Sequence, residues 1–131
     1  MLDELLRRVS NHTPQRLETD GRFPEAAVLV PITRSDEPEL ILTLRASGLS
    51  THGGEVAFPG GRRDPEDPDL IFTALREAEE EIGLPPGLVE VIGPLSPLIS
   101  LHGIRVTPYV GVIPDYVEYL ANDAEIAAVF S

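Results

Sequence analysis

The chain has 131 residues and a hydrophobic fraction of 42%, which suits one domain with an ordinary core. Ten arginines against 22 acidic residues give a formal net charge of −12, and this negative field argues against a nucleic-acid-binding protein. Without cysteine there are no disulfides or thiolate metal sites. No signal-peptide layout and no apolar run of about 20 residues is visible, so we expect a cytoplasmic protein without a membrane segment.

The first half of the chain predicts one short helix followed by strands. Apolar residues from Leu2 to Val9 have helical spacing. The apolar runs Glu25–Ile32 and Glu39–Leu44 flank a polar turn cluster and predict two strands paired as a hairpin. A brief strand at Val56–Phe58 is expected to stop at the sequence Pro59-Gly60-Gly61.

The second half predicts a longer helix and four more strands. The helix is expected to begin near Asp69, which suits an N-cap, and to end at Gly83. The later strands are expected at Leu88–Ile92, Leu98–Leu101, Val106–Ile113 and Ala124–Phe130. One strongly periodic helix among short strands predicts an α+β fold with a mixed sheet. Because the last apolar run stops without a turn, we expect a chain truncated at its C-terminus; a natural edge strand is the alternative.

A helical wheel orders the glutamates of the longer helix. At about 100° per residue the apolar residues form one stripe that faces the core. This stripe consists of Ile71, Ala74, Leu75, Ala78 and Ile82. Glu77 and Glu81, four residues apart, lie together at one border of the stripe, whereas Glu80 lies farther out. We therefore expect Glu77 and Glu81 to be the inner pair and Glu80 to approach from outside.

The crowded glutamates predict a divalent-metal site. Like charges at this spacing destabilise a helix by a few tenths of a kcal/mol per pair, and a bound Mg²⁺ or Mn²⁺ would compensate because hard cations prefer carboxylate oxygens. The turn at Gly60 and Gly61 lets the backbone approach the helix and offers a carbonyl as a further ligand. A solvated acidic helix face is the alternative reading of the same glutamates.

The Gly-Gly turn and the helix together resemble the Nudix box, whose pattern is Gly, five residues, Glu, seven residues, then Arg-Glu-U-x-Glu-Glu-x-Gly-U with U a bulky aliphatic residue. The second half matches at Arg76, Glu77, Glu80, Glu81, Gly83 and Leu84, with the small Ala78 at the first U. The first half departs, because the acid after Gly61 is Asp67 rather than glutamate, and eight residues separate it from Arg76. This departure argues against a role for Asp67.

The upstream segments are similar to the coenzyme A pyrophosphatase branch of Nudix enzymes. That branch has a signature running Leu-Leu-Thr-x-Arg-Ser/Ala, then Arg, then Gly, then Phe-Pro-Gly-Gly. Ile41–Ala46 and Gly54–Gly61 match it in spacing, and Ser50 stands where an arginine is expected. The resemblance implies one Nudix domain over residues 1–131, with an α/β/α sandwich. It also implies metal-dependent hydrolysis of coenzyme A or its derivatives to 3′,5′-ADP and 4′-phosphopantetheine.

The resemblance also assigns roles to individual residues. The expected catalytic residues are Arg76, Glu77, Glu80 and Glu81. The expected metal ligands are Glu77, Glu81, Glu80 and the Gly61 carbonyl. The expected substrate-binding residues are Arg45, His52, Gly60 and Gly61. Glu80 is either a third ligand or the residue that orients or deprotonates water. His52 and His102 also suit ordinary surface histidines. The expected partner is a small nucleotide substrate, coenzyme A, and a homodimer is compatible with the family.

The sequence is compatible with two other functions. Because Ser50 departs from the coenzyme A signature, one alternative is a Nudix hydrolase that acts on another nucleoside diphosphate derivative, such as ADP-ribose or a dinucleotide. A Nudix-fold binding module without catalysis is the second alternative, because a fold does not dictate a function. Loss of a helix glutamate is typical of such modules, and all three glutamates are present here.

Overall fold

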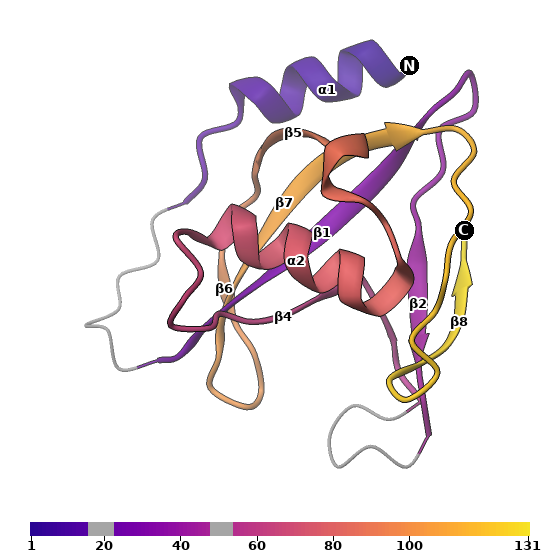
Figure 1. Ribbon diagram of the computed structural model, residues 1–131. Helices are drawn as coiled ribbons and strands as arrows, with labels where there is room; N and C mark the ends of the chain where they lie inside the picture. Colours follow the sequence, from indigo (N-terminus) through magenta and orange to yellow (C-terminus); the bar gives the residue numbers. More distant parts are fainter. Residues whose placement is uncertain (16–22, 48–53) are drawn as a thin grey trace.

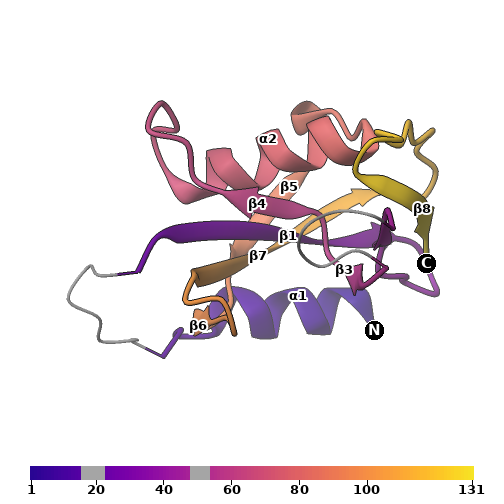
Figure 2. The same ribbon diagram turned by 90° about the horizontal axis from the view of Figure 1, so that it is seen from below.

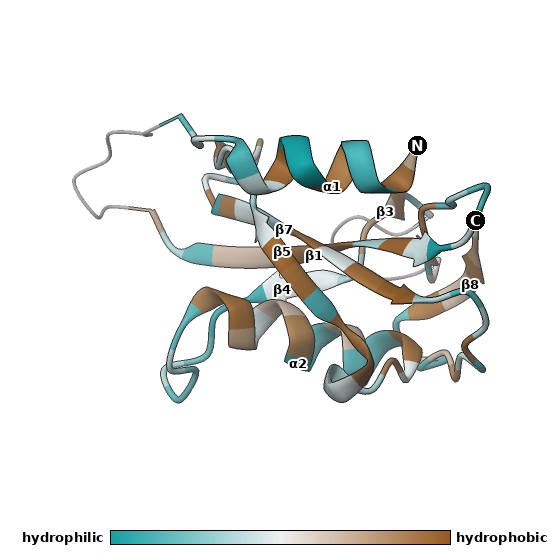
Figure 3. Ribbon diagram, turned by 90° about the horizontal axis from the view of Figure 1, so that it is seen from above, coloured by the Kyte–Doolittle hydropathy of each residue, from teal (hydrophilic) through white to brown (hydrophobic). Residues whose placement is uncertain are grey.

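The computed structural model describes residues 1–15, 23–47 and 54–131 and has three layers. A five-stranded mixed sheet lies between α1 (Leu2–Asn11) on one face and α2 (Leu70–Ile82) on the other (Figure 1, Figure 3). The other elements are β1 (Glu25–Arg34), β2 (Leu42–Arg45), β3 (Val56–Ala57), β4 (Gly60–Arg62), the 3-10 helix η1 (Pro86–Leu88), β5 (Glu90–Pro94), β6 (Leu98–Ile99), β7 (Arg105–Pro114) and β8 (Ile126–Phe130). The expected α+β fold with an α/β/α sandwich is confirmed. No helix in the described ranges is long and apolar enough to cross a membrane.

The two long strands form the centre of the main sheet. β1 and β7 run parallel from the pair Glu25 and Arg105 to the pair Arg34 and Pro114. β4 lies antiparallel on the other side of β1, and β5 and β6 pair antiparallel with β7. β4 pairs with β1 only at residues 26–28, whereas β7 pairs with β1 along its whole length.

Alternating side chains of β1 supply the two halves of the core. Ala27 and Leu29 point to one face, where they pack with Ala78 and Ile82 of α2. Ile32 points to the opposite face and packs with Leu2 of α1. The two-residue period of a strand thus places one hydrophobic cluster under each helix.

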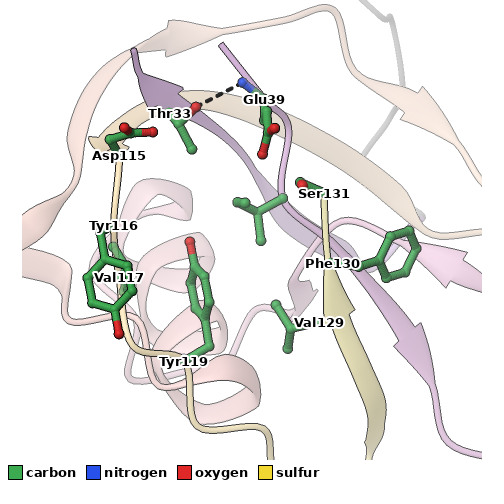
Figure 4. Close-up of a pocket in the computed structure, with 10 residues that line it drawn as sticks. Thr33, Glu39, Asp115, Tyr116, Val117, Tyr119, Val129, Phe130 and Ser131 are labelled. Atoms are coloured by element: carbon green, nitrogen blue, oxygen red, sulfur yellow. Dashed lines mark hydrogen bonds between the residues drawn. The ribbon is translucent and has the colours of Figure 1, made fainter. Parts of the chain in front are cut away.

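The expected hairpin between the first two strands forms only at its turn and does not continue into β2. Only Ile32 and Leu40 form a bridge there, with Glu39 N–H donating to Thr33 Oγ1 at 2.8 Å (Figure 4). β2 then pairs with β3 and β8 in a second, three-stranded sheet; Figure 1 shows β2 beside β8, and Figure 2 shows β3 and β8 from below. Thr33 N–H donates to the Glu39 carbonyl at 2.9 Å and Ile41 N–H donates to the Pro31 carbonyl at 3.1 Å, and beyond Ile41 the strand β2 takes its hydrogen bonds from β3 and β8 instead.

The brief strand expected before the Gly-Gly sequence is β3, which ends at Ala57 as predicted, and the two glycines then begin a new strand, β4. A Cβ at Gly60 would lie 2.5 Å from the Ala27 carbonyl oxygen and 2.6 Å from the Val28 Cα. Only glycine allows β4 to approach β1 this closely. The same approach brings Gly61 against the side chain of Glu77 on α2, where a Cβ would lie 2.5 Å from the Glu77 Cδ.

Both predicted ends of α2 are confirmed, while its buried face differs from the predicted stripe. Asp69 caps the helix by accepting from Phe72 N–H at 2.8 Å, and Gly83 ends it with a left-handed φ of 69°. Ile71 was expected in the core but is 37% exposed, whereas Thr73 is fully buried. Thr73 turns inward because its hydroxyl donates to a buried carboxylate below the helix.

Candidate active site

The three helix glutamates differ in burial in the order that the wheel predicts. The side chain of Glu81 is 3% exposed, that of Glu77 is 17% exposed and that of Glu80 is 54% exposed. Glu77 and Glu81 lie on the side of α2 that faces β4, where both line one pocket. The helix therefore presents an inner pair of carboxylates, and Glu80 stands apart from them.

Glu81 is a buried carboxylate held by one backbone donor and one arginine. Gly60 N–H donates to its Oε2 at 3.1 Å, and Arg45 Nη1 lies 3.6 Å from its Oε1. Burial raises the pKa of Glu81 to about 7, against the lowering effect of the Gly60 hydrogen bond, and the charge of Glu77 adds to the rise. A cation would remove this penalty, because it stabilises the ionised carboxylate.

Glu77 has a similar environment closer to solvent. Burial raises the pKa of its carboxyl group, and the positive charge of Arg76 opposes that rise. Arg76 Nη1 donates to Glu77 Oε1 at 3.1 Å. The carboxylate is thus fixed between Arg76 and the backbone of Gly61, which fits the role of a metal ligand with restricted freedom.

Arg76 links Glu80 to Glu77 of the inner pair. Its Nη1 donates to both oxygens of Glu80 at 3.2 Å, so that Glu80 faces the arginine and solvent. Arg76 therefore contacts two of the helix glutamates at once. This geometry favours Arg76 as a positioning residue.

Asp67 corrects the prediction made from the loop length. Its carboxylate is buried and accepts from Arg76 Nε at 3.1 Å and Nη2 at 3.0 Å, from Thr73 Oγ1 at 2.8 Å and from Asp64 N–H at 2.9 Å. These hydrogen bonds, with Arg76 first, lower the pKa of Asp67 to about 2 despite its burial. The extra loop residue does not prevent contact, because Asp67 reaches Arg76 from beneath the start of α2. The sequence signal that could have indicated the pair of Asp67 and Arg76 is Thr73, a hydrogen-bonding residue near the start of the helix that contacts the loop acid.

The inner carboxylates open into a pocket of about 760 Å³. The predicted residues Arg45, Gly60, Gly61, Glu77 and Glu81 all line it, and His102 lies in its wall. Segments from β1, β2, β4, α2 and the start of β7 thus meet at one place. Two sequence predictions, on Ser50 and His52, lie outside the described residues.

The donor set of the pocket fits a hard divalent cation. Glu77 and Glu81 offer carboxylate oxygens, and the described part of the chain has no group of three or more Asp, Glu or His side chains arranged to hold an ion directly. Magnesium commonly binds to one or two protein carboxylates and keeps several waters. The residues present therefore suit such an ion, with Glu77 and Glu81 as its protein ligands.

Comparisons with known proteins agree with the fold and the helix. The sequence model of the NUDIX domain family matches residues 23–129 of this chain. The Nudix hydrolase NudL of Cronobacter sakazakii is 50% identical over 129 residues, which cover 98% of this chain and 67% of that protein. The chain spans about two thirds of the length of the curated relatives it matches.

Solved structures share the fold at low sequence identity. The Ap4A hydrolase of C. elegans, in a binary complex, has a TM-score of 0.68 at 18% identity, covering 80% of this chain and 76% of its own. The NUDIX domain of Shewanella oneidensis NrtR, complexed with ADP ribose, has a TM-score of 0.65 at 20% identity. The match covers 95% of this chain and 79% of that domain. The chain therefore belongs to the Nudix hydrolase family, whose enzymes are pyrophosphohydrolases.

Proposed function

We propose that this chain hydrolyses the pyrophosphate bond of coenzyme A or a coenzyme A derivative, giving 3′,5′-ADP and 4′-phosphopantetheine. The observation that carries the proposal is the contact between Arg45 and Glu81 in one pocket. Arg45 belongs to the segment Ile41–Ala46, which resembles the coenzyme A branch, and Glu81 belongs to the Nudix-box helix. The two sequence signatures therefore serve one site.

The metal-dependent part of the proposal assigns Mg²⁺ or Mn²⁺ to Glu77 and Glu81, with the Gly61 carbonyl as a further ligand. When bound, the ion would neutralise the diphosphate and lower the pKa of the attacking water. The water oxygen forms a bond to phosphorus as the bridging P–O bond breaks, and the leaving group departs as a phosphate. Arg76 orients Glu77 and Glu80 for this reaction. Glu80, turned toward solvent, serves as a third ligand or as the residue that orients the attacking water or takes its proton.

The substrate side of the proposal rests on residues opposite the helix. Arg45 would contact a substrate phosphate, because its guanidinium lines the pocket and its buried Nε has no hydrogen-bond partner among the described residues. Gly60 and Gly61 would let the diphosphate approach the backbone of β4 closely. His52, which lies outside the described residues, is also proposed as a substrate contact.

A substrate panel tests the proposal directly. Coenzyme A, ADP-ribose and a dinucleoside polyphosphate are each incubated with Mg²⁺ or Mn²⁺, and the products are separated by chromatography. We expect coenzyme A to show the highest kcat/KM and to release 3′,5′-ADP. Turnover of ADP-ribose or the dinucleotide without turnover of coenzyme A would replace the substrate assignment, and no turnover of any compound would favour a binding module.

A further inference from the structure

The pocket at the inner glutamates has an apolar floor on the main sheet. This floor is formed by side chains of β1 and β7, namely Ala26, Val28 and Val106. The charged lining residues are the acidic Glu55, Glu77, Glu81 and Glu125 and the basic Arg45 and Arg62. Because the pocket is mostly acidic, an anionic substrate depends on cations bound at the glutamates and on these two arginines.

Arg62 extends over the β4 edge of this floor. In the antiparallel pair of β1 and β4, Arg62 lies directly opposite Ala26. Residues opposed in this way have their side chains on the same face of the sheet, and Ala26 belongs to the pocket floor. The preceding residue, Gly61, faces the other side, where a Cβ would meet Glu77. The strand therefore places the Arg62 guanidinium on the pocket face.

The side chain of Arg62 has no partner within the described part of the protein. Every other arginine that the structure describes forms an ion pair with an aspartate or a glutamate. The guanidinium of Arg62 is exposed and makes neither an ion pair nor a hydrogen bond with a described residue, while its backbone carbonyl accepts from Arg76 Nη2 at 3.3 Å. Since Arg45 already faces Glu81, Arg62 is the pocket arginine that is left for an anionic group of a ligand.

Arg62 lies one side-chain length from the proposed diphosphate site. Gly60 N–H donates to Glu81, and Gly61 lies against Glu77. Each residue of a strand advances the chain by about 3.3 Å, so the Arg62 backbone lies about 7 Å from that of Gly60. A second phosphate held by Arg62 must therefore be close to the diphosphate in the same substrate molecule.

Coenzyme A carries such a pair of groups on one ribose, with the diphosphate at the 5′ position and a single phosphate at the 3′ position. ADP-ribose and dinucleoside polyphosphates carry a hydroxyl at that 3′ position. The guanidinium fork binds phosphate bidentately, whereas a hydroxyl offers it no negative charge. A residue beside the diphosphate site that binds the second phosphate thus distinguishes these classes of substrate.

We propose that Arg62 binds the 3′-phosphate of coenzyme A and selects coenzyme A over nucleoside diphosphate derivatives that have a 3′-hydroxyl. The inference rests on the proposed hydrolysis of coenzyme A. It adds a residue that neither sequence pattern specifies, because the coenzyme A signature ends at Gly61 and the Nudix box leaves the next position open. Arg45 and Arg62 then have separate roles, at the glutamates and at the β4 edge of the floor.

Two substrates that differ only in the 3′-phosphate test this role. KM and kcat are measured for coenzyme A and for 3′-dephospho-coenzyme A with the wild type, Arg62→Gln, Arg62→Lys and Arg34→Gln. We expect the wild type to favour coenzyme A about tenfold in kcat/KM, mainly through KM. Arg62→Gln should bring this ratio to about one by raising KM for coenzyme A alone, and Arg62→Lys should keep part of the preference.

Arg34→Gln is the matched control, because Arg34 pairs with Glu90 and is not among the described residues that line this pocket. It should keep the wild-type ratio, and thermal unfolding shows that each variant is folded. A wild-type ratio near one, or an Arg62→Gln ratio equal to that of the wild type, would overturn the inference.

Product binding separates this inference from the proposed hydrolysis. Isothermal titration calorimetry compares 3′,5′-ADP with AMP, which lacks the 3′-phosphate, and needs no turnover. We expect the wild type to bind 3′,5′-ADP about tenfold more tightly than AMP and Arg62→Gln to bind the two equally. If coenzyme A is not hydrolysed but this difference is found and is lost in Arg62→Gln, the hydrolysis proposal fails and the 3′-phosphate site stands. Equal or undetectable binding of both nucleotides by the wild type would overturn the inference.

Discussion

Asp67 and Arg76 form a bidentate ion pair beneath the start of α2, with Nε 3.1 Å from Oδ1 and Nη2 3.0 Å from Oδ2. Arg76 uses its remaining nitrogen, Nη1, for Glu77 and Glu80. Since one planar guanidinium makes all these contacts, the position of Asp67 determines where two helix glutamates point. The loop before the helix thus acts on two helix carboxylates, Glu77 and Glu80, through a single arginine.

Asp67→Asn should therefore lower activity and change the response of the fold to acid. We expect kcat to fall on the order of 10- to 100-fold, as when a residue that orients metal ligands is lost. The pKa of Asp67 is lowered to about 2, so its stabilising effect is present above the ordinary value near 3.8 and is lost as pH falls toward 2. Urea unfolding between pH 2 and 7 should show a smaller decrease on acidification in the variant.

The exposed neighbour Asp64 provides the control for this experiment. Its carboxylate lies 3.5 Å from Arg76 Nη2 and is mostly solvated, so Asp64→Asn should behave almost like the wild type. Equal loss of activity in both variants would show that Asp67 has no special positioning role.

The two adjacent glycines of β4 should respond differently to alanine. In Gly60→Ala the new Cβ meets the backbone of β1, so we expect a loss of stability of about 1–3 kcal/mol. In Gly61→Ala the Cβ meets the carboxylate of Glu77, the end of a flexible side chain, and we expect near-normal stability with Mn²⁺ binding weakened at least tenfold. Chemical denaturation and Mn²⁺ titration of both variants separate these effects, and a large stability loss in Gly61→Ala would contradict the prediction.

Glu81→Gln should abolish activity while making the metal-free protein more stable. Burial raises the pKa of Glu81 to about 7, above its unfolded value of 4.5, so ionising it costs folding stability as pH rises through this interval. Glutamine avoids that cost, and we expect a gain of about 1–2 kcal/mol at pH 7.5 without metal. Urea unfolding with and without EDTA measures this change in the free energy of unfolding. Exposed Glu80→Gln is the matched variant and should change stability little.

Arg45→Gln should weaken substrate binding more than it slows catalysis. The arginine lines the pocket beside Glu81, and its loss removes a phosphate contact in the proposed complex. We expect KM for coenzyme A to rise about tenfold, which corresponds to roughly 1.4 kcal/mol, with a smaller change in kcat. Arg34→Gln removes a surface arginine paired with Glu90 and should leave both constants unchanged. An unchanged KM in Arg45→Gln would remove Arg45 from the substrate site.

Local geometry explains what the sequence by itself determined. The caps at Asp69 and Gly83 depend on residues within one turn of each helix end, and both were predicted correctly. The inner position of Glu77 and Glu81 and the outer position of Glu80 follow from 100° of rotation per residue. The α+β fold with a mixed sheet also follows from patterns of local hydrophobicity, whereas the sandwich of helices on both faces was implied by the resemblance to Nudix enzymes.

Contacts between distant segments were decided only by the tertiary structure. β2 belongs to the second sheet because it pairs with β3 and with the distant strand β8, and no local pattern reports which distant strand a segment will meet. Asp67 met Arg76 because Thr73 and the loop place the carboxylate beneath α2, which a count of loop residues does not show. Glu125 reached the pocket because backbone hydrogen bonds join its segment to Glu81 and Ala46. The sequence alone thus determined the carboxylates of the helix, and long-range packing decided which other charges surround them.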